Sequence, residues 1–188
     1  MVNILRSTQD YINTLKDELD RLQTDEIDSV IRLLKKTKGS GTQIFLAGNG
    51  GSAATVNHFM CDFSKNAVPG DVGRFRVISL ANSVSSITAL GNDFTYSDVF
   101  VEQLKNLMND GDILIAVSAS GNSPNIIKAC EYVKSRKGVV VGLTGFDGGR
   151  LHRLADLPVH CDCDCIEQVE DMHLMVLHIL VCAFKFGF

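Results

Sequence analysis

The chain has 188 residues, 45% of them hydrophobic, and a formal net charge of −4 at pH 7. This length is typical of one domain with a substantial core, so we expect a single domain over residues 1–188. The acidic balance, without any basic block, argues against nucleic acid or an anionic membrane as a partner. The first residues lack the apolar run of a signal peptide, which favours a cytoplasmic location.

Two amphipathic helices are predicted before the first strand, forming a helical extension over residues 1–40. Between Asn3 and Gln23, apolar residues recur at helical spacing with acids and lysines between them. A second helix is expected to begin at Thr24, which suits the N-cap, and to end in the Lys35–Gly41 segment. We expect the first helix to pack against another subunit, although core packing within one subunit would give the same stripe.

The stretch from Ile44 to Asn66 contains the pattern around which we expect the chain to be organised. An apolar run ends in the turn GNGGS, and a helix-compatible segment begins at once. Glycines let the backbone approach a ligand, and the first N–H groups of a helix have no partner inside it, so the turn suits a phosphate. Many α/β proteins use such a turn for packing alone. On the helix, His58 and Asp62 are one turn apart and can face one metal ion or substrate atom.

A second turn of this kind follows a buried strand predicted from Asp112 to Ser118. The turn reads SASGNSP, in which Ser123 and Pro124 suit the N-cap and the first position of a helix. A capped helix explains Ser123, but it does not explain Ser118 and Ser120, whose hydroxyls would crowd the same free N–H groups. We therefore interpret this serine loop as a second phosphate-binding turn.

The remaining elements alternate between strands and helices. In chain order they are a strand at Arg76–Leu80, a short helix at Ser83–Leu90, a helix at Tyr96–Met108, a helix at Pro124–Arg136, strands at Gly138–Leu143 and Leu157–His160, and a final helix from Ile166 to Phe184. This alternation predicts an α/β fold with a single, doubly wound, parallel five-stranded sheet preceded by two helices. Ligands bind such sheets at the carboxyl ends of the strands, where both turns lie.

Cysteines and isolated histidines give weaker signals. Six cysteines in a chain without a secretion signal predict free thiols. The run CDCDC at 161–165 lacks the C-x-x-C spacing of a metal site, so we interpret it as small residues in an extended segment. The alternative for His58 is a core histidine bonded to backbone, and His178, in an apolar stretch, would by itself more often be a core residue than a ligand. We expect His173 to lie at an interface.

Five segments, taken together, resemble one family. They are the turn Gly48–Ser52, the pair Asn92–Asp93, the loop Ser118–Ser123, the segment LTGFDGG at Leu143–Gly149, and EDMHLMVLHIL at Glu170–Leu180. Their order and spacing resemble those of the sugar isomerase (SIS) domain family, and more narrowly of its phosphoheptose isomerases, over nearly the whole chain. The resemblance implies the SIS fold, a homotetramer with active sites between subunits, and one divalent metal per subunit, usually zinc.

The resemblance also implies an activity and a set of site residues. Such isomerases interconvert an aldose and a ketose phosphate, here most narrowly sedoheptulose 7-phosphate and D-glycero-D-manno-heptose 7-phosphate. The implied substrate-binding residues are Asn49, Gly50, Gly51, Ser52, Asn92, Asp93, Ser118, Ala119, Ser120 and Ser123, the last four holding the phosphate. The implied metal ligands are His58, Asp62, Glu170 and His178. The implied catalytic residues are Asp62 as base, with Glu170 as an alternative base, and His178 as acid or metal ligand.

Three positions depart from the family pattern. Asp62 stands where the family has glutamate, Glu170 where it has glutamine, and Asn66 where it tends to have arginine. Asp62 is one methylene shorter than glutamate, and misplacement of about that size can lower a rate about a hundredfold. The alternative function is a non-catalytic SIS protein that binds a sugar phosphate or a protein partner, such as a replication initiator. The two imidazoles and two carboxylates at the metal positions favour the enzyme.

Overall fold

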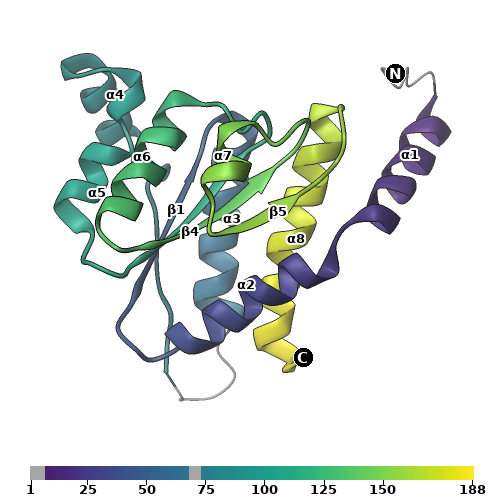
Figure 1. Cartoon of the computed structure of the whole chain (residues 1–188), viewed down its shortest axis with the longest axis horizontal. Helices are drawn as coiled ribbons and strands as arrows, with labels where there is room; N and C mark the ends of the chain where they lie inside the picture. The colour runs from purple at the N-terminus through teal and green to yellow at the C-terminus, as the bar shows by residue number, and fades with distance from the viewer. Residues whose placement is uncertain (1–6, 68–72) are drawn as a thin grey trace.

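Five short apolar segments form one parallel sheet in the computed structural model, which describes residues 7–67 and 73–188 (Figure 1). The strands are β1 (Gln43–Gly48), β2 (Arg76–Ser79), β3 (Ile113–Ser118), β4 (Val139–Thr144) and β5 (Leu157–His160), in the spatial order β2-β1-β3-β4-β5. All four neighbouring pairs are parallel. β1 and β3 are buried at every position, as expected for strands covered on both faces. The predicted fold class is therefore confirmed.

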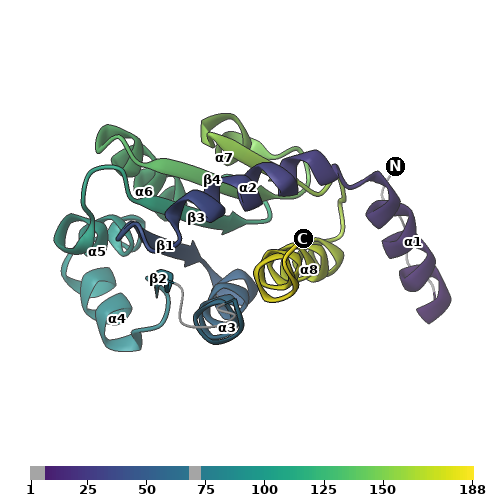
Figure 2. The ribbon, with the colours of Figure 1, turned by 90° about the horizontal axis from the view of Figure 1, so that it is seen from below.

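Helices cover both faces of this sheet. They are α1 (Thr8–Arg21), α2 (Thr24–Thr37), α3 (Gly50–Asn66), α4 (Val84–Asp93), α5 (Val101–Leu107), α6 (Pro124–Ser135), α7 (Gly149–Leu154) and α8 (Ile166–Phe186), with a 3-10 turn, η1, at Tyr96–Asp98. Figure 2 shows α3 and α8 side by side on one face, α6 and α7 on the other, and α1 projecting from the body of the molecule. The predicted pair of helices before the first strand is confirmed.

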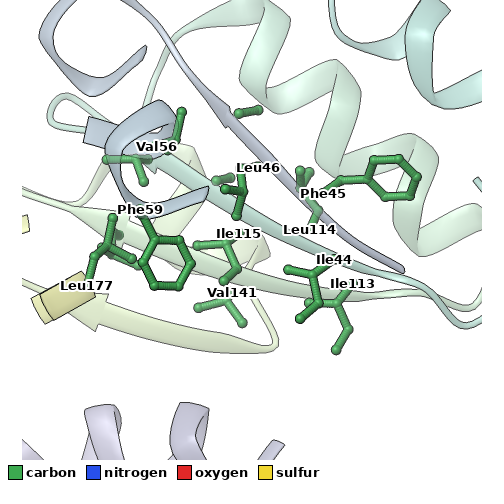
Figure 3. Close-up of a cluster of buried hydrophobic side chains, with 14 of the residues drawn as sticks. Ile44, Phe45, Leu46, Val56, Phe59, Ile113, Leu114, Ile115, Val141 and Leu177 are labelled. Atoms are coloured by element: carbon green, nitrogen blue, oxygen red, sulfur yellow. The ribbon is translucent and has the colours of Figure 1, made fainter. Parts of the chain in front are cut away.

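The core between the sheet and α3 and α8 follows from the strand register. Leu46 of β1 is paired with Ile115 of β3, which is paired in turn with Val141 of β4, so the three side chains form one row on one face of the sheet. Phe59 of α3 and Leu177 of α8 pack near this row (Figure 3), and all five side chains are fully buried. This packing fixes α3 and α8 beside each other, and both helices carry predicted site residues.

Several predicted boundaries differ from the structure for local reasons. The first helix begins at Thr8, where the side chain of Ser7 accepts a hydrogen bond from the Asp10 N–H; the predicted residues 3–6 lie outside the described residues. Thr24 is not the N-cap of α2, because Gln23 holds that position. The predicted Tyr96–Met108 helix is divided into η1 and α5. The short helix α7 was not predicted, since six residues are too few to display helical periodicity.

His173 is buried within the chain, so its predicted place at an interface is wrong. Its side chain is 1% exposed, on the face of α8 that packs toward the sheet. Burial lowers the pKa of His173 to about 4, against a smaller opposing effect of the Thr144 backbone. The imidazole is therefore neutral in the folded protein at neutral pH.

Because His173 is buried, we expect the protein to lose stability in acid. Its folded pKa of about 4 lies below the unfolded value, so between about pH 6.5 and pH 4 the unfolded chain binds a proton that the folded chain does not. The free energy of unfolding should fall by about 3 kcal/mol through this window, and this contribution is fully present above it. Urea denaturation at several pH values checks this, with His173→Met as the reference. Equal pH slopes for the two proteins would contradict the prediction.

Gly121, in the serine loop, is predicted to tolerate no side chain. Its φ is +62°, and an added Cβ would collide with the backbone carbonyl of Gly148. We expect Gly121→Ala to lower the free energy of unfolding by about 3 kcal/mol, because strain and a backbone clash combine. Gly111 is the matched control: its φ is +86°, but the space around it is open, so Gly111→Ala should lose only about 1 kcal/mol. Equal losses in urea denaturation would show that the clash is unimportant.

Candidate active site

The order of the strands places the two predicted turns beside each other. The chain leaves β1 toward β2 on one side and leaves β3 toward β4 on the other, so the sheet has its topological switch point between β1 and β3. The first turns of α3 and α6 flank the crevice above these strands. A cavity of about 280 Å³ lies there. The predicted residues that line it are Asn49, Ser52, Ser118, Ala119, Ser120, Ser123 and Glu170.

The serine loop is held in shape by its own hydrogen bonds. The Gly121 N–H donates to the Ser118 carbonyl at 3.0 Å, and the hydroxyls of Ser118 and Ser123 lie 3.3 Å apart. Ser123 takes the predicted N-cap position of α6, but its hydroxyl makes no capping bond, so it stays on the cavity side. Two helix N-termini and several hydroxyls thus face one cavity, an arrangement that favours an anion.

Cys163 packs behind this loop rather than forming a metal site. It is buried in a small cluster with Ala119 and Val169. Burial raises the pKa of the Cys163 thiol, which keeps it protonated and a poor metal ligand. All six cysteines are free thiols, as predicted.

Glu170 lies directly over the glycine turn. A Cβ added to Gly51 would collide with the Glu170 carboxylate, so the absence of a side chain at Gly51 gives the carboxylate its place. Gly50, the first residue of α3, has a φ of +53°, which favours glycine. Gly50 and Gly51 therefore form the turn, and Gly51 also lets the Glu170 carboxylate of α8 come close to it. The sequence pattern had suggested only the turn.

A second group of functional side chains lies further along α3 and α8. The Nε2 atoms of His58 and His178 are 3.0 Å apart, and Asp62 Oδ2 lies 3.2 Å from the first and 3.8 Å from the second. The other oxygen of Asp62 accepts a hydrogen bond from Asn66 at 3.3 Å. The side chains of His58 and His178 are 53% and 43% exposed, so neither is the core histidine that its apolar surroundings suggested.

This donor set fits a zinc ion. Nitrogen and oxygen ligands about 2.0–2.1 Å from a tetrahedral zinc lie about 3.3 Å from one another. The three separations, from 3.0 to 3.8 Å, bracket that value. Two imidazoles and one carboxylate also match the three protein ligands of many catalytic zinc sites. Among the described residues, this is the single group of three or more such side chains whose ligand atoms converge.

The structure does not bring all the predicted site residues together within one chain. Glu170 and His178 are eight residues apart on α8, a rise of about 12 Å, so Glu170 lines the cavity while His178 joins the exposed group. Asn92 and Asp93 are exposed at the end of α4, hydrogen-bonded to each other, and do not line the cavity. Within one chain, these residues therefore do not surround a single ligand.

Two residues near the cavity were missed from the sequence. Asn125, in the first turn of α6, and Tyr96, in η1, both hydrogen-bond the side chain of Asn49. Asn125 follows the serine loop directly, and that proximity is the one signal that could have identified it. Nothing local marks Tyr96.

Comparison with known proteins now decides the family. A model of the SIS domain matches residues 9–145, which is most of the chain. The chain belongs to the SIS domain family. The SIS model ends before α8, whereas a solved relative covers 96% of the chain and so includes at least part of α8. None of the helices in the described ranges is both long and apolar enough to cross a membrane.

Several relatives of this SIS chain are phosphoheptose isomerases. A phosphoheptose isomerase of Helicobacter pylori is 34% identical over 173 residues, covering 88% of this chain and 85% of its own. One from Colwellia psychrerythraea is 38% identical over 143 residues, covering 74% and 72%. The solved phosphoheptose isomerase of Neisseria gonorrhoeae superposes with a TM-score of 0.84 at 25% identity, covering 96% of this chain and all of that one. The similarity therefore reaches both the cavity and α8.

Proposed function

We propose that this chain is an aldose–ketose isomerase that converts sedoheptulose 7-phosphate into D-glycero-D-manno-heptose 7-phosphate. The observation that carries the proposal is a single cavity at the sheet's switch point that combines an anion cradle with a carboxylate, in a chain whose relatives are phosphoheptose isomerases. An acyclic sugar phosphate needs both parts: a seat for the phosphate, and a base beside the carbons that exchange a proton.

The phosphate is bound by the serine loop. Ser118, Ser120 and Ser123 line the cavity, and the positive end of the α6 dipole favours an anion beside them. Asn49 and Ser52 of the first turn contact the sugar, as do Asn92 and Asp93 once the site is assembled. These contacts place the reacting carbons toward Glu170.

Glu170 is the base. Its carboxylate faces the cavity over Gly51, and no other described residue is hydrogen-bonded to it. Asp62, the other candidate base, has one oxygen between two imidazoles and the other bonded to Asn66. Glu170 would take the proton from C1 of the ketose and return it to C2. Because Glu170 stands where the family has glutamine, this chain would place its base on α8 rather than on α3.

His58, Asp62 and His178 are the proposed zinc ligands. Zinc bound there would supply a Lewis acid that polarises the substrate carbonyl and stabilises enediolate charge. Asp62 Oδ2 lies close to the His58 imidazole, and a hydrogen bond from Asn66 orients the Asp62 carboxylate. Glu170, the fourth predicted ligand, is outside this group within one chain, which leaves its carboxylate available as the base.

The active enzyme is proposed to be a homotetramer with sites between subunits. The three proposed zinc ligands are partly exposed on α3 and α8, where Leu174, Met175 and Ile179 are also only partly buried. A second copy packed there would cover these apolar side chains. It would also bring the cavity of the second copy close to the zinc group of the first. Mixing a Ser120→Asp variant with a His178→Ala variant tests this, because shared sites would regain part of the activity. We also place the enzyme in the cytoplasm, where its free thiols stay reduced.

Incubation of the purified chain with sedoheptulose 7-phosphate tests the function. ¹³C NMR should show the aldose phosphate accumulating in the presence of zinc, and the matched Glu170→Gln variant should produce none. Turnover by Asp62→Asn with zinc still bound would move the ligand role away from Asp62. Absence of turnover by the wild-type chain, with or without zinc, would favour the non-catalytic binding protein instead.

A further inference from the structure

Asn49 is held in a network whose hydrogen-bonding directions can be assigned. Asn125, 1% exposed, accepts the backbone N–H of Ile126 through its Oδ1 at 2.9 Å, which identifies the oxygen of that amide. The same oxygen accepts from Asn49 Nδ2 at 2.9 Å, and Asn125 Nδ2 donates back to Asn49 Oδ1 at 2.9 Å. Turning the Asn49 amide over would set N–H against N–H and oxygen against oxygen. The orientation of Asn49 is therefore determined by Asn125.

Tyr96 completes the set of partners of Asn49. Its hydroxyl donates to Asn49 Oδ1 at 3.0 Å. A carbonyl oxygen has two lone pairs, and here both are occupied, one by Asn125 and one by Tyr96. The Asn49 amide nitrogen carries two hydrogens, of which one points to Asn125. The Asn49 side chain can therefore offer a ligand one N–H donor and no acceptor.

We propose that Tyr96 is a positioning residue that, with Asn125, makes Asn49 a donor-only contact for an oxygen of the sugar phosphate. The inference deepens the proposed function and rests on it for the identity of the ligand. A fixed donor beside two helix N-termini selects an acceptor, meaning a carbonyl, phosphate or hydroxyl oxygen. Without Tyr96, Asn49 Oδ1 would keep a free lone pair that repels such an oxygen.

The turn that carries Tyr96 is anchored to α6, although the Tyr96 side chain is exposed. It is 57% exposed, so burial does not account for its position. The turn that carries it is fixed to α6 by Lys128, whose Nζ donates to Ser97 Oγ at 2.8 Å and to Asp98 Oδ1 at 2.9 Å. Hydrogen bonds from Thr95 and Lys128 lower the pKa of Asp98, which keeps this anchor charged. Asn125 and Lys128 are both on α6, so one helix fixes both ends of the network.

A spectroscopic test addresses the network without any substrate. In ¹⁵N-labelled protein, the Asn49 side-chain amide signals are identified by their disappearance in Asn49→Asp. Tyr96→Phe should shift these signals. Tyr132→Phe, a matched change near the C-terminal end of α6, should leave them in place. Unshifted Asn49 signals in Tyr96→Phe would overturn the inference even if the chain proves to be an isomerase.

A double-mutant cycle tests the positioning role. Tyr96→Phe should raise KM for sedoheptulose 7-phosphate about fivefold with little change in kcat, the effect of one ordinary hydrogen bond. In an Asn49→Ala background the same change should have no further effect, because Tyr96 acts through Asn49. Additive losses would overturn the inference and make Tyr96 a direct substrate contact. If the wild-type chain lacks turnover, the same cycle is measured on the dissociation constant for sedoheptulose 7-phosphate. If that sugar does not bind, the proposed function is wrong. The amide signals then still show whether Tyr96 is hydrogen-bonded to Asn49.

Discussion

Replacing His178 by alanine is expected to abolish zinc binding and to lower kcat for sedoheptulose 7-phosphate by about a thousandfold. His178 Nε2 lies 3.0 Å from the His58 nitrogen and 3.8 Å from Asp62. Removing it leaves two ligands, too few for a catalytic zinc site. Without bound zinc, the site would also lose the Lewis acid proposed to stabilise the enediolate charge. Zinc content by mass spectrometry and turnover by NMR measure the two losses separately.

The fold should survive this substitution. The His178 side chain is 43% exposed, so alanine there opens no buried cavity. In the wild type, a chelator should lower the melting temperature, because a bound ion stabilises only the folded state; in His178→Ala it should have no effect. Cys61→Ala is the control, since Cys61 is an exposed thiol on α3 outside the zinc group. Full zinc occupancy in His178→Ala would exclude it as a ligand.

Local patterns were sufficient to predict the sheet and both turns. The strands β1 and β3 are continuous apolar runs, and each is followed at once by glycine or serine and then by a helix. Strand burial and turn chemistry are set by residues close together in the chain, so a single sequence contains them. The parallel order of the strands then places both turns at one edge.

Contacts between distant segments could not be predicted in the same way. From Leu174 to Phe184 the α8 helix is apolar nearly all round, so this part of the sequence does not show which face meets the sheet. His173, five residues before His178 and on another side of the helix, was placed at an interface, although it is buried near Thr144 at the end of β4. His178 was placed among the possible metal ligands only by family resemblance. The approach of Glu170 to Gly51 depends on how α8 packs against α3, which no local pattern specifies.

Replacing Gly51 by alanine is expected to lower kcat about a hundredfold while leaving the protein folded. The new methyl group would collide with the Glu170 carboxylate, which is the flexible end of its side chain and can rotate away. Alanine is favoured over glycine in a helix by up to about 1 kcal/mol, so stability should hold or rise. The loss of rate would therefore report the displacement of Glu170. Thermal unfolding and steady-state kinetics on one preparation separate the two quantities.

A shorter acid provides the matched test of this mechanism. Glu170→Asp alone withdraws the carboxylate, so this variant should have a low kcat. The shorter side chain leaves room for the added methyl group in the double variant, so adding Gly51→Ala should lower kcat little further. In a Glu170→Gln background, Gly51→Ala should likewise add no loss, because the base is already absent. Wild-type turnover by Gly51→Ala would show that the carboxylate is not needed over the glycine turn. The base would then be Asp62, and Asp62→Glu, by extending its reach, should raise the rate.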